Sequence, residues 1–290
     1  MASGYLDGLL PPASTRAGYL LRLSRPRFWP YLAGPVVVGV AYGAREVGDL
    51  FAPLPLALFA YFLVPGNVYL YGINDVFDAD ADENNEKKED REVRYRGDRL
   101  VLGAVAVSAL LAVPLAAVLP LPALAALAAW WLLATEYSAP PLRFKTTPLL
   151  DSVSNGLYVL PGVVAYAALT GRYPPAAAVA GGWLWTMGMH TFSAIPDIEP
   201  DREAGIETTA TALGERRAYA YCAACWLLAA LVFGLVHPFF AAVLGIYPVV
   251  VLGIVASGVD VSEAYWWYPA INTLVGMAVT MAGLWVLLYG

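Results

Sequence analysis

Residues 51–82 read FAPLPLALFAYFLVPGNVYLYGINDVFDADAD, an apolar stretch that leads directly into a cluster of acidic residues. The segment 51–73 carries no charged side chain, and a membrane-spanning helix needs roughly 20 apolar residues. Asp75, Asp78 and Asp82 follow at spacings of three and four, which places them on one face of a helix. Carboxylates near a bilayer are costly unless a partner compensates them. The stretch therefore predicts a membrane helix that ends in a functional site.

A second acidic cluster, Asp197-Ile198-Glu199-Pro200-Asp201, also follows directly on an apolar stretch. Asp197 and Asp201 share a helix face if the helix continues through Pro200. Oxygen ligands without a nearby Cys or His suit a hard cation, and Mg²⁺ commonly bridges carboxylates and substrate phosphates. One such cluster alone would favour the alternative of a solvated, helix-capping loop. Two clusters at membrane boundaries favour a shared metal site.

The composition is that of an integral membrane protein. Of 290 residues, 59% are hydrophobic and only 14% are charged, whereas charged residues make up about a quarter of a soluble domain. We expect an all-α bundle of nine transmembrane helices around a central cavity. It would form a single domain over residues 1–290, with 1–27 as a cytoplasmic or interfacial segment. The expected spans are approximately 28–44, 51–73, 100–118, 121–138, 149–170, 174–195, 217–236, 239–258 and 266–289.

The distribution of Lys and Arg predicts the orientation in the cell membrane. With the N-terminus inside and nine spans, the inner segments hold 15 of the 17 Lys and Arg, and only Arg45 and Arg172 lie outside. Both acidic clusters then lie on the cytoplasmic side and the C-terminus lies outside. Ser14 is expected to cap a short amphipathic helix at the interface. Pro65-Gly66 is expected to break the second span, as in helices that line a cavity.

Four segments, in chain order, resemble the UbiA-type intramembrane prenyltransferase family. Arg25-Pro26 leads into the first span, and Asn74-Asp75-x-x-Asp78-x-x-x-Asp82 is similar to the NDxxDxxxD signature. Residues 137–145 (YSAPPLRFK) resemble the loop between the two motifs, and 197–208 (DIEPDREAGIET) resemble the second motif. The resemblance covers nearly the whole chain. It implies that Mg²⁺ on the two Asp motifs holds the diphosphate of an isoprenyl donor, while a lipophilic acceptor arrives from membrane lipid.

Carried over residue by residue, the resemblance implies two overlapping sets of site residues. The expected catalytic residues are Asp75, Asp78, Asp82, Asp197 and Asp201, which with Asn74 are also the expected metal ligands. The expected diphosphate-binding residues are Asn74, Arg25, Lys87, Arg91, Arg143, Lys145 and Arg202. The chemistry agrees, because cations neutralise a leaving diphosphate and aromatic ring faces stabilise an allylic cation. Candidate wall residues are Tyr69, Tyr71, Tyr158, Tyr166, Trp183, Trp185 and Phe192.

Departures from the family pattern concern the acceptor. Members that prenylate aromatic acids often have Tyr and Lys seven and four residues before the second motif, where this chain has His190 and Ser193. Residues 71–80 and 188–197 are similar, more narrowly, to the lycopene elongases of halophilic archaea. Those proteins add a C5 dimethylallyl unit to each end of lycopene, with hydration, en route to C50 bacterioruberin carotenoids. A net charge of −6 with only 3 Lys agrees with a high-salt source.

This narrower resemblance implies dimethylallyl diphosphate as the donor and lycopene as the acceptor. The acceptor pocket would include His190, Ser193, Tyr71 and Phe192. Attack by an alkene leaves a tertiary cation that water can quench to an alcohol. His190 is expected either to position that water or to be an ordinary packed histidine.

Two alternatives stay open at this point. The same class of enzyme can act on a quinone precursor, a tetrapyrrole alcohol or a glycerol-phosphate lipid. A cation transporter would also use carboxylates as ion sites, but such sites lie near the membrane midplane. Both acidic clusters are expected at one membrane face, and no acid is expected in the middle of a span.

Overall fold

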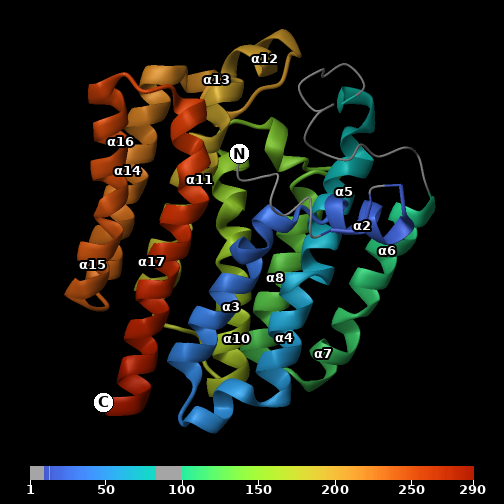
Figure 1. Cartoon of the computed structure of the whole chain (residues 1–290), viewed down its shortest axis with the longest axis vertical. Coiled ribbons are helices and arrows are strands. Elements are labelled where there is room, and N and C mark those ends of the chain that lie inside the picture. Colours follow the sequence, from blue (N-terminus) through green and yellow to red (C-terminus); the bar gives the residue numbers. More distant parts are fainter. Residues whose placement is uncertain (1–9, 13, 83–98) are drawn as a thin grey trace.

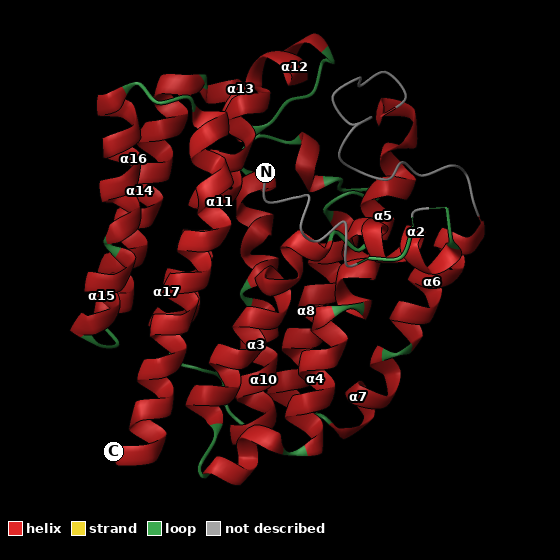
Figure 2. Ribbon diagram, viewed as in Figure 1, coloured by secondary structure: helices red, strands yellow, loops and turns green. Residues whose placement is uncertain are grey.

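The structure is a computed structural model that describes residues 10–12, 14–82 and 99–290, except for the side chains of residues 78–82, 262, 263 and 266. All regular structure in these ranges is helical, and the described chain contains no strand (Figure 2). The predicted all-α fold is confirmed.

The helices form a bundle of long rods that lie side by side (Figure 1). The first half of the chain forms α2 (Arg16–Leu23), η1 (Pro26–Phe28), α3 (Trp29–Gly43), η2 (Val47–Phe51), α4 (Pro53–Leu63), α5 (Pro65–Asp82), α6 (Arg99–Leu110), α7 (Ala112–Val118), α8 (Leu121–Glu136) and η4 (Phe144–Thr146). The second half forms α9 (Leu150–Val153), η5 (Ser154–Tyr158), α10 (Leu160–Thr170), α11 (Ala176–Ala194), η6 (Ile195–Asp197), α12 (Ile198–Glu203), α13 (Thr209–Leu213), α14 (Glu215–Gly234), α15 (Pro238–Leu244), α16 (Ile246–Ser257) and α17 (Val261–Tyr289).

Six helical segments of the described chain are long and apolar enough to cross a membrane. They are Pro53–Phe77, Arg99–Val118, Leu150–Thr170, Glu215–Gly234, Pro238–Ser257 and Trp267–Tyr289. The other three expected spans also correspond to helices, namely α3, α8 and α11, but these are shorter or less apolar. A membrane protein is therefore supported, and the count of nine spans stays a prediction.

The second span is broken where the sequence predicts it. α4 ends at Leu63 and α5 begins at Pro65, because proline has no N–H to continue the helical hydrogen bonds. The buried side chain of Asn67 compensates, since its amide nitrogen donates to the carbonyl oxygens of Phe62 and Leu63 at 2.9 and 3.0 Å. A hydrocarbon environment offers no water for those carbonyls, so Asn67 stabilises the break.

The helices pack around two hydrophobic clusters. One joins α3, α4, α5, α8 and α10, and the other joins α11, α14, α16 and α17. Small residues permit close approach within the first cluster, because a Cβ built on Gly39 of α3 would lie 2.2 Å from the carbonyl oxygen of Gly162 in α10. Close packing at small residues is a common way for membrane helices to associate.

The segments that carry the two acidic motifs lie toward one end of the bundle. The C-terminal turns of α5 and the α12–α13 segment point to the same end, and the C-terminus lies at the opposite end (Figure 1). At the N-terminal side, the short helix expected in residues 1–27 is present as α2. Its cap is Thr15 rather than Ser14, because the Thr15 hydroxyl accepts the N–H of Gly18 at 3.1 Å.

Candidate active site

A small cavity of about 150 Å³ brings together residues from five separated segments of the chain. Its lining residues are Arg25, Leu70, Tyr71, Asn74, Tyr137, Asn155, Leu157, Tyr158 and His190. Four of them, Arg25, Tyr71, Asn74 and His190, are site residues predicted from the sequence. A larger, open groove of about 650 Å³ lies between α2, α5 and α6, but its lining is apolar apart from Arg99 and Ser108. The smaller cavity is therefore the candidate active site.

α5 presents the first motif to this cavity. The amide nitrogen of Asn74 donates to the hydroxyl of Ser138 at 3.0 Å, which fixes the amide and directs its oxygen elsewhere. The buried carboxylate of Asp75 forms an ion pair of 3.0 Å with Arg25. The Arg25 guanidinium also lies 4.8 Å from the ring centre of Tyr71, a favourable cation–π distance. Arg25 is thus held between the first acidic motif and an aromatic wall.

Three residues of the described chain other than glycine have a left-handed backbone. They are Arg25 (φ 52°), Arg143 (φ 42°) and Leu149 (φ 68°). Such conformations cost about 1–3 kcal/mol each and occur mainly where function requires them. Two of these residues are arginines that the sequence predicts at the diphosphate. Arg143 also donates to the carbonyl oxygen of Phe77 at 3.1 Å, which joins its loop to the end of α5.

The second motif begins at the N-cap of α12. Asp197 ends η6, and α12 continues through Pro200, as the shared face of Asp197 and Asp201 requires. Burial, together with the negative charges of Asp197 and Asp151, raises the pKa of the Asp201 carboxyl to about 6.

Arg202 is engaged elsewhere. Its guanidinium donates to the Glu199 carboxylate at 2.8 Å and to the carbonyl oxygen of Thr211 at 3.0 Å. The bond to Thr211 holds α12 against α13. In the structure Arg202 therefore makes contacts within the protein, whereas the sequence predicts that it binds diphosphate.

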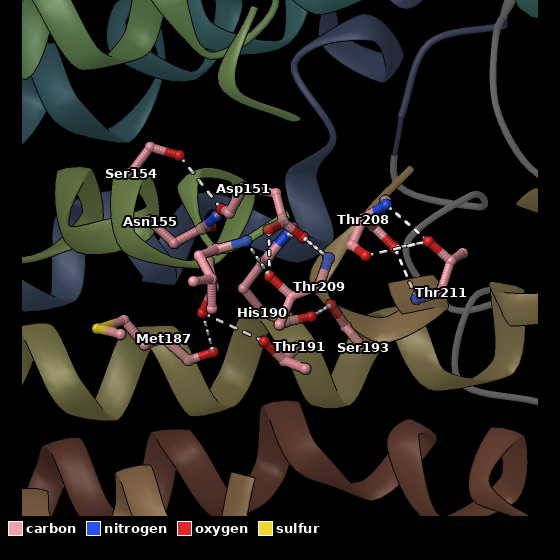
Figure 3. Close-up of polar contacts among 12 residues, drawn as sticks. Asp151, Ser154, Asn155, Met187, His190, Thr191, Ser193, Thr208, Thr209 and Thr211 are labelled. Atoms are coloured by element: carbon pink, nitrogen blue, oxygen red, sulfur yellow. Dashed lines mark hydrogen bonds and ion pairs between the residues drawn. The ribbon is translucent and has the colours of Figure 1, made fainter. Parts of the chain in front are cut away.

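The sequence did not predict Asp151 as a site residue, nor the lining residues Leu70, Tyr137, Asn155 and Leu157. Asp151 is fully buried and lies between α11 and α13 (Figure 3). Its carboxylate accepts the N–H of Thr209 at 2.9 Å and also accepts the Thr209 hydroxyl. Nε2 of His190 lies 3.5 Å from the same carboxylate. The available signal was an acid two residues inside the expected span 149–170. It lies at the start of that span, so it does not bear on the expectation that no acid lies in the middle of a span.

The predicted acceptor pocket is only partly formed by the predicted residues. Tyr71 and His190 line the cavity, as does Tyr158. Phe192 does not, because it is fully buried on the opposite side of α11 and stacks on Tyr268 with ring centres 4.4 Å apart. Ser193 donates back to the carbonyl oxygen of His190 at 2.7 Å and is not among the lining residues.

Several predicted site residues are not placed by the structure. Lys87 and Arg91 lie outside the described residues, and Asp78 and Asp82 belong to α5 but their side chains are not described. Lys145 lies in η4, next to the cavity-lining loop, where its N–H donates to the carbonyl oxygen of Tyr137 at 3.0 Å.

The donor set fits a hard divalent cation. Asn74, Asp75, Asp197 and Asp201 offer carboxylate and amide oxygens, and the charges of Asp197 and Asp151 contribute to the raised pKa of Asp201. Within the described ranges, no three acidic, His or Cys side chains lie close enough to form a metal centre.

Comparisons with known proteins agree with this fold. Residues 32–274 match the model of the UbiA prenyltransferase family. The chain belongs to this family, and it is a prenyltransferase.

Particular members define a narrower group. A lycopene elongase/hydratase of Haloarcula japonica is 64% identical over 286 residues, which cover 98% of this chain and 97% of that protein. A protein with the same description from Haloferax volcanii is 70% identical over 287 residues, covering 99% and 94%. Among solved structures, a UbiA homolog from Archaeoglobus fulgidus bound to DMAPP and Mg²⁺ has a TM-score of 0.68 at 21% identity, covering 91% of this chain and 98% of that chain.

Proposed function

We propose that this prenyltransferase transfers a dimethylallyl group from its diphosphate to an end of lycopene, with Mg²⁺ as cofactor and with hydration of the product. The observation that carries the proposal is the cavity beside α5, which is lined by the cationic Arg25, the amide of Asn74, and the rings of Tyr71 and Tyr158. The names of the haloarchaeal relatives support lycopene as the acceptor. The Archaeoglobus structure supports the donor and the metal.

The size of the cavity favours a short donor. Its volume of about 150 Å³ corresponds to roughly five waters at ~30 Å³ each, and a dimethylallyl group has five carbon atoms. Pockets for drug-sized ligands are larger, at about 300–1,000 Å³. A five-carbon unit therefore matches the space between Tyr71, Tyr158 and His190 better than a long isoprenyl chain does.

The diphosphate would lie toward Arg25, Asn74 and Arg143, with Lys87, Arg91 and Lys145 as further cationic partners. Asn74, Asp75, Asp78, Asp82, Asp197 and Asp201 would hold Mg²⁺, which supplies positive charge that makes diphosphate a better leaving group. In this arrangement Arg25 exchanges its ion pair with Asp75 for the diphosphate oxygens. Arg25 would thus act as the counterion of the leaving diphosphate whenever Asp75 binds Mg²⁺.

The aromatic wall would stabilise the allylic cation and keep water away from it. The hydroxyl oxygens of Tyr71 and Tyr158 lie 3.3 Å apart, and the ring of Tyr31 meets that of Tyr158 edge to face with centres 6.1 Å apart. Ring faces stabilise cations, and exclusion of water prevents premature hydrolysis. An alkene acceptor needs no deprotonation before attack, so the absence of a lysine at Ser193 is compatible with lycopene.

The orientation follows from the distribution of Lys and Arg. With the N-terminus and both acidic motifs on the cytoplasmic side, the donor enters from the compartment where soluble diphosphates occur. The acceptor enters from the membrane lipid.

The test is a transfer assay in liposomes that contain the purified protein. Dimethylallyl diphosphate and Mg²⁺ are supplied with lycopene, with an aromatic quinone precursor, or with a prenylglycerol phosphate. We expect five-carbon-longer carotenoids with lycopene alone, loss of activity with EDTA and recovery with added Mg²⁺. Prenylation of either other acceptor in place of lycopene would refute the acceptor assignment, and indifference to EDTA would refute the metal.

Variants of the acidic motifs provide the matched control. Asp75→Ala, Asp78→Ala and Asp201→Ala should abolish transfer while the protein remains in the membrane. Glu203→Gln removes an exposed carboxylate from the same short helix as Asp201 and should retain activity. Equal losses of activity in Glu203→Gln and Asp201→Ala would mean that α12 contributes only its net negative charge, not a specific metal ligand.

A further inference from the structure

The proposed transfer of the prenyl group assigns no role to Asp151, yet no acidic side chain in the described part of the chain is more deeply buried. A carboxylate inside a bundle is costly unless hydrogen bonds and a cationic partner compensate its charge. The partners of Asp151 therefore indicate what it is for.

Two elements supply those partners. Thr209, at the start of α13, donates its backbone N–H at 2.9 Å and its hydroxyl to the carboxylate. His190 on α11 places Nε2 at 3.5 Å from Oδ2 of Asp151 (Figure 3). Among the described residues, His190 is the one side chain at ion-pair distance that can carry a positive charge.

His190 connects this buried carboxylate to the cavity, because it is also one of the lining residues. A carboxylate next to Nε2 favours the tautomer with the proton on Nε2, which leaves Nδ1 as the acceptor. No described residue hydrogen-bonds to Nδ1. The imidazole contacts Asp151 and meets the ring of Tyr137 edge to face, at a ring-centre distance of 6.0 Å.

We infer that Asp151 is a positioning residue that holds His190 with its proton on Nε2, so that Nδ1 is the general base for the water that ends the reaction. This inference rests on the proposed function. After the alkene has attacked the dimethylallyl group, the positive charge lies on a tertiary carbon of the acceptor. The water oxygen forms a bond to that carbon, one O–H bond breaks, and its proton moves to Nδ1.

The charge of the resulting imidazolium is balanced by Asp151 at the moment it forms. Without that carboxylate, water attack is slower, and the cation instead loses a proton from a neighbouring carbon to give an alkene. General-base catalysis typically contributes 10²–10⁴-fold. Asp151→Asn should therefore lower the ratio of hydrated to unsaturated product by about 10²-fold while dimethylallyl diphosphate is still consumed.

Asn is the informative substitution because it keeps the size of the side chain and an oxygen for Thr209. The Thr209 N–H and His190 Nε2 both face Oδ2 of Asp151, and the Thr209 hydroxyl faces Oδ1. The amide oxygen of Asn therefore stays at the Oδ2 position, and its amide nitrogen donates to the Thr209 hydroxyl, which can also accept. Asp151→Asn thus removes the negative charge that balances the imidazolium and leaves the Nε2–H tautomer in place.

Thr209→Val is the matched structural control. It removes the hydroxyl that donates to Asp151 and that accepts the N–H of Leu149 at 2.8 Å, but it leaves the carboxylate beside His190. If Asp151 only joins α9 to α13, both variants lower stability and total product, and the product ratio stays as in the unmodified protein.

The tautomer can be measured without turnover. The chain has two histidines, and His237 is the N-cap of α15, where its Nδ1 accepts the N–H of Phe239 at 3.2 Å. His237→Asn retains a capping side chain and leaves His190 as the single histidine. Nitrogen-15 NMR of histidine-labelled protein in lipid then reports which ring nitrogen of His190 carries the proton, with and without Asp151→Asn.

We expect the Nε2–H form in the His237→Asn protein, with or without Asp151→Asn, and a change of product ratio in Asp151→Asn but not in Thr209→Val. The Nδ1–H form in the His237→Asn protein, an unchanged ratio, or equal ratio changes in both variants would overturn the inference. Purely unsaturated product from the unmodified protein would overturn it too, while transfer to lycopene would stand. Absence of any prenylated carotenoid would instead refute the proposed function, and the tautomer measurement would still decide the positioning role.

Discussion

Gly156→Ala is expected to damage the active site through one methyl group. Gly156 is buried in η5, and a Cβ at this position would lie 1.8 Å from Cε2 and 2.1 Å from Cδ2 of the Trp183 indole. The indole cannot move away cheaply, because its N–H donates to the carbonyl oxygen of Val153 at 2.7 Å. Overpacking of this kind typically costs about 1–3 kcal/mol.

The functional effect follows from the neighbours of Gly156. η5 also carries Asn155, Leu157 and Tyr158, which line the cavity. A misplacement of about 1 Å at reacting groups can cost on the order of 10²-fold in rate. We therefore expect Gly156→Ala to lower kcat for dimethylallyl transfer by about 10²-fold, together with a lower unfolding temperature in detergent.

Two further variants separate this clash from the general effect of a Gly→Ala change. A Cβ on Gly253 of α16 would meet nothing within 4 Å, so Gly253→Ala should leave both rate and stability close to the unmodified protein. Trp183→Leu in the Gly156→Ala background removes the clashing ring and should recover part of the lost rate. Normal activity in Gly156→Ala, or an equal loss in Gly253→Ala, would refute the reasoning.

Three other outcomes are expected. Because the pKa of Asp201 is raised to about 6, protons compete with the cation below that pH. The apparent Mg²⁺ affinity, from direct metal-binding titrations, should fall by up to about tenfold per pH unit below 6 and lose this slope in Asp201→Asn. Arg25→Lys loses a forked donor and a stacked cation, and should raise KM for dimethylallyl diphosphate about tenfold with little change in membrane content; an unchanged KM would remove Arg25 from the diphosphate site. Asn67→Leu leaves two carbonyl groups unpaired at the break in the second span and should destabilise the protein by about 2 kcal/mol in denaturation experiments, whereas equal stability would mean that the break needs no side-chain cap.

Hydropathy predicted most of the fold because a segment that crosses the membrane must be apolar over the length of the span. The expected spans 100–118 and 149–170 differ by one residue or less at each end from the helical segments Arg99–Val118 and Leu150–Thr170. The break at Pro65 was also predictable, since proline removes a hydrogen bond wherever it lies inside a helix. The local chemistry of the chain decided these features.

The site was predicted less completely because helix rotation depends on packing between helices. His190 and Phe192 are two residues apart on α11, so their side chains point in different directions around the helix. In the structure His190 lines the cavity, whereas Phe192 packs in the second hydrophobic cluster. Asp151 was missed for a related reason, since its partner Thr209 is distant in sequence and nothing local distinguishes a buried carboxylate from one at the membrane surface.

The three residues with left-handed backbone also have a consequence for engineering a more stable variant. At Arg25 and Arg143 the unfavourable φ comes with a side chain that contacts α5, so replacing either with glycine would relieve strain only by deleting the functional group. Leu149 differs, because its residue surface is 56% exposed and its N–H, which glycine retains, makes the bond to Thr209. Leu149→Gly would thus recover part of about 1–3 kcal/mol of backbone strain without removing a group from the cavity. The strain in this enzyme divides into a part that belongs to the proposed diphosphate site and a part that a protein engineer can remove.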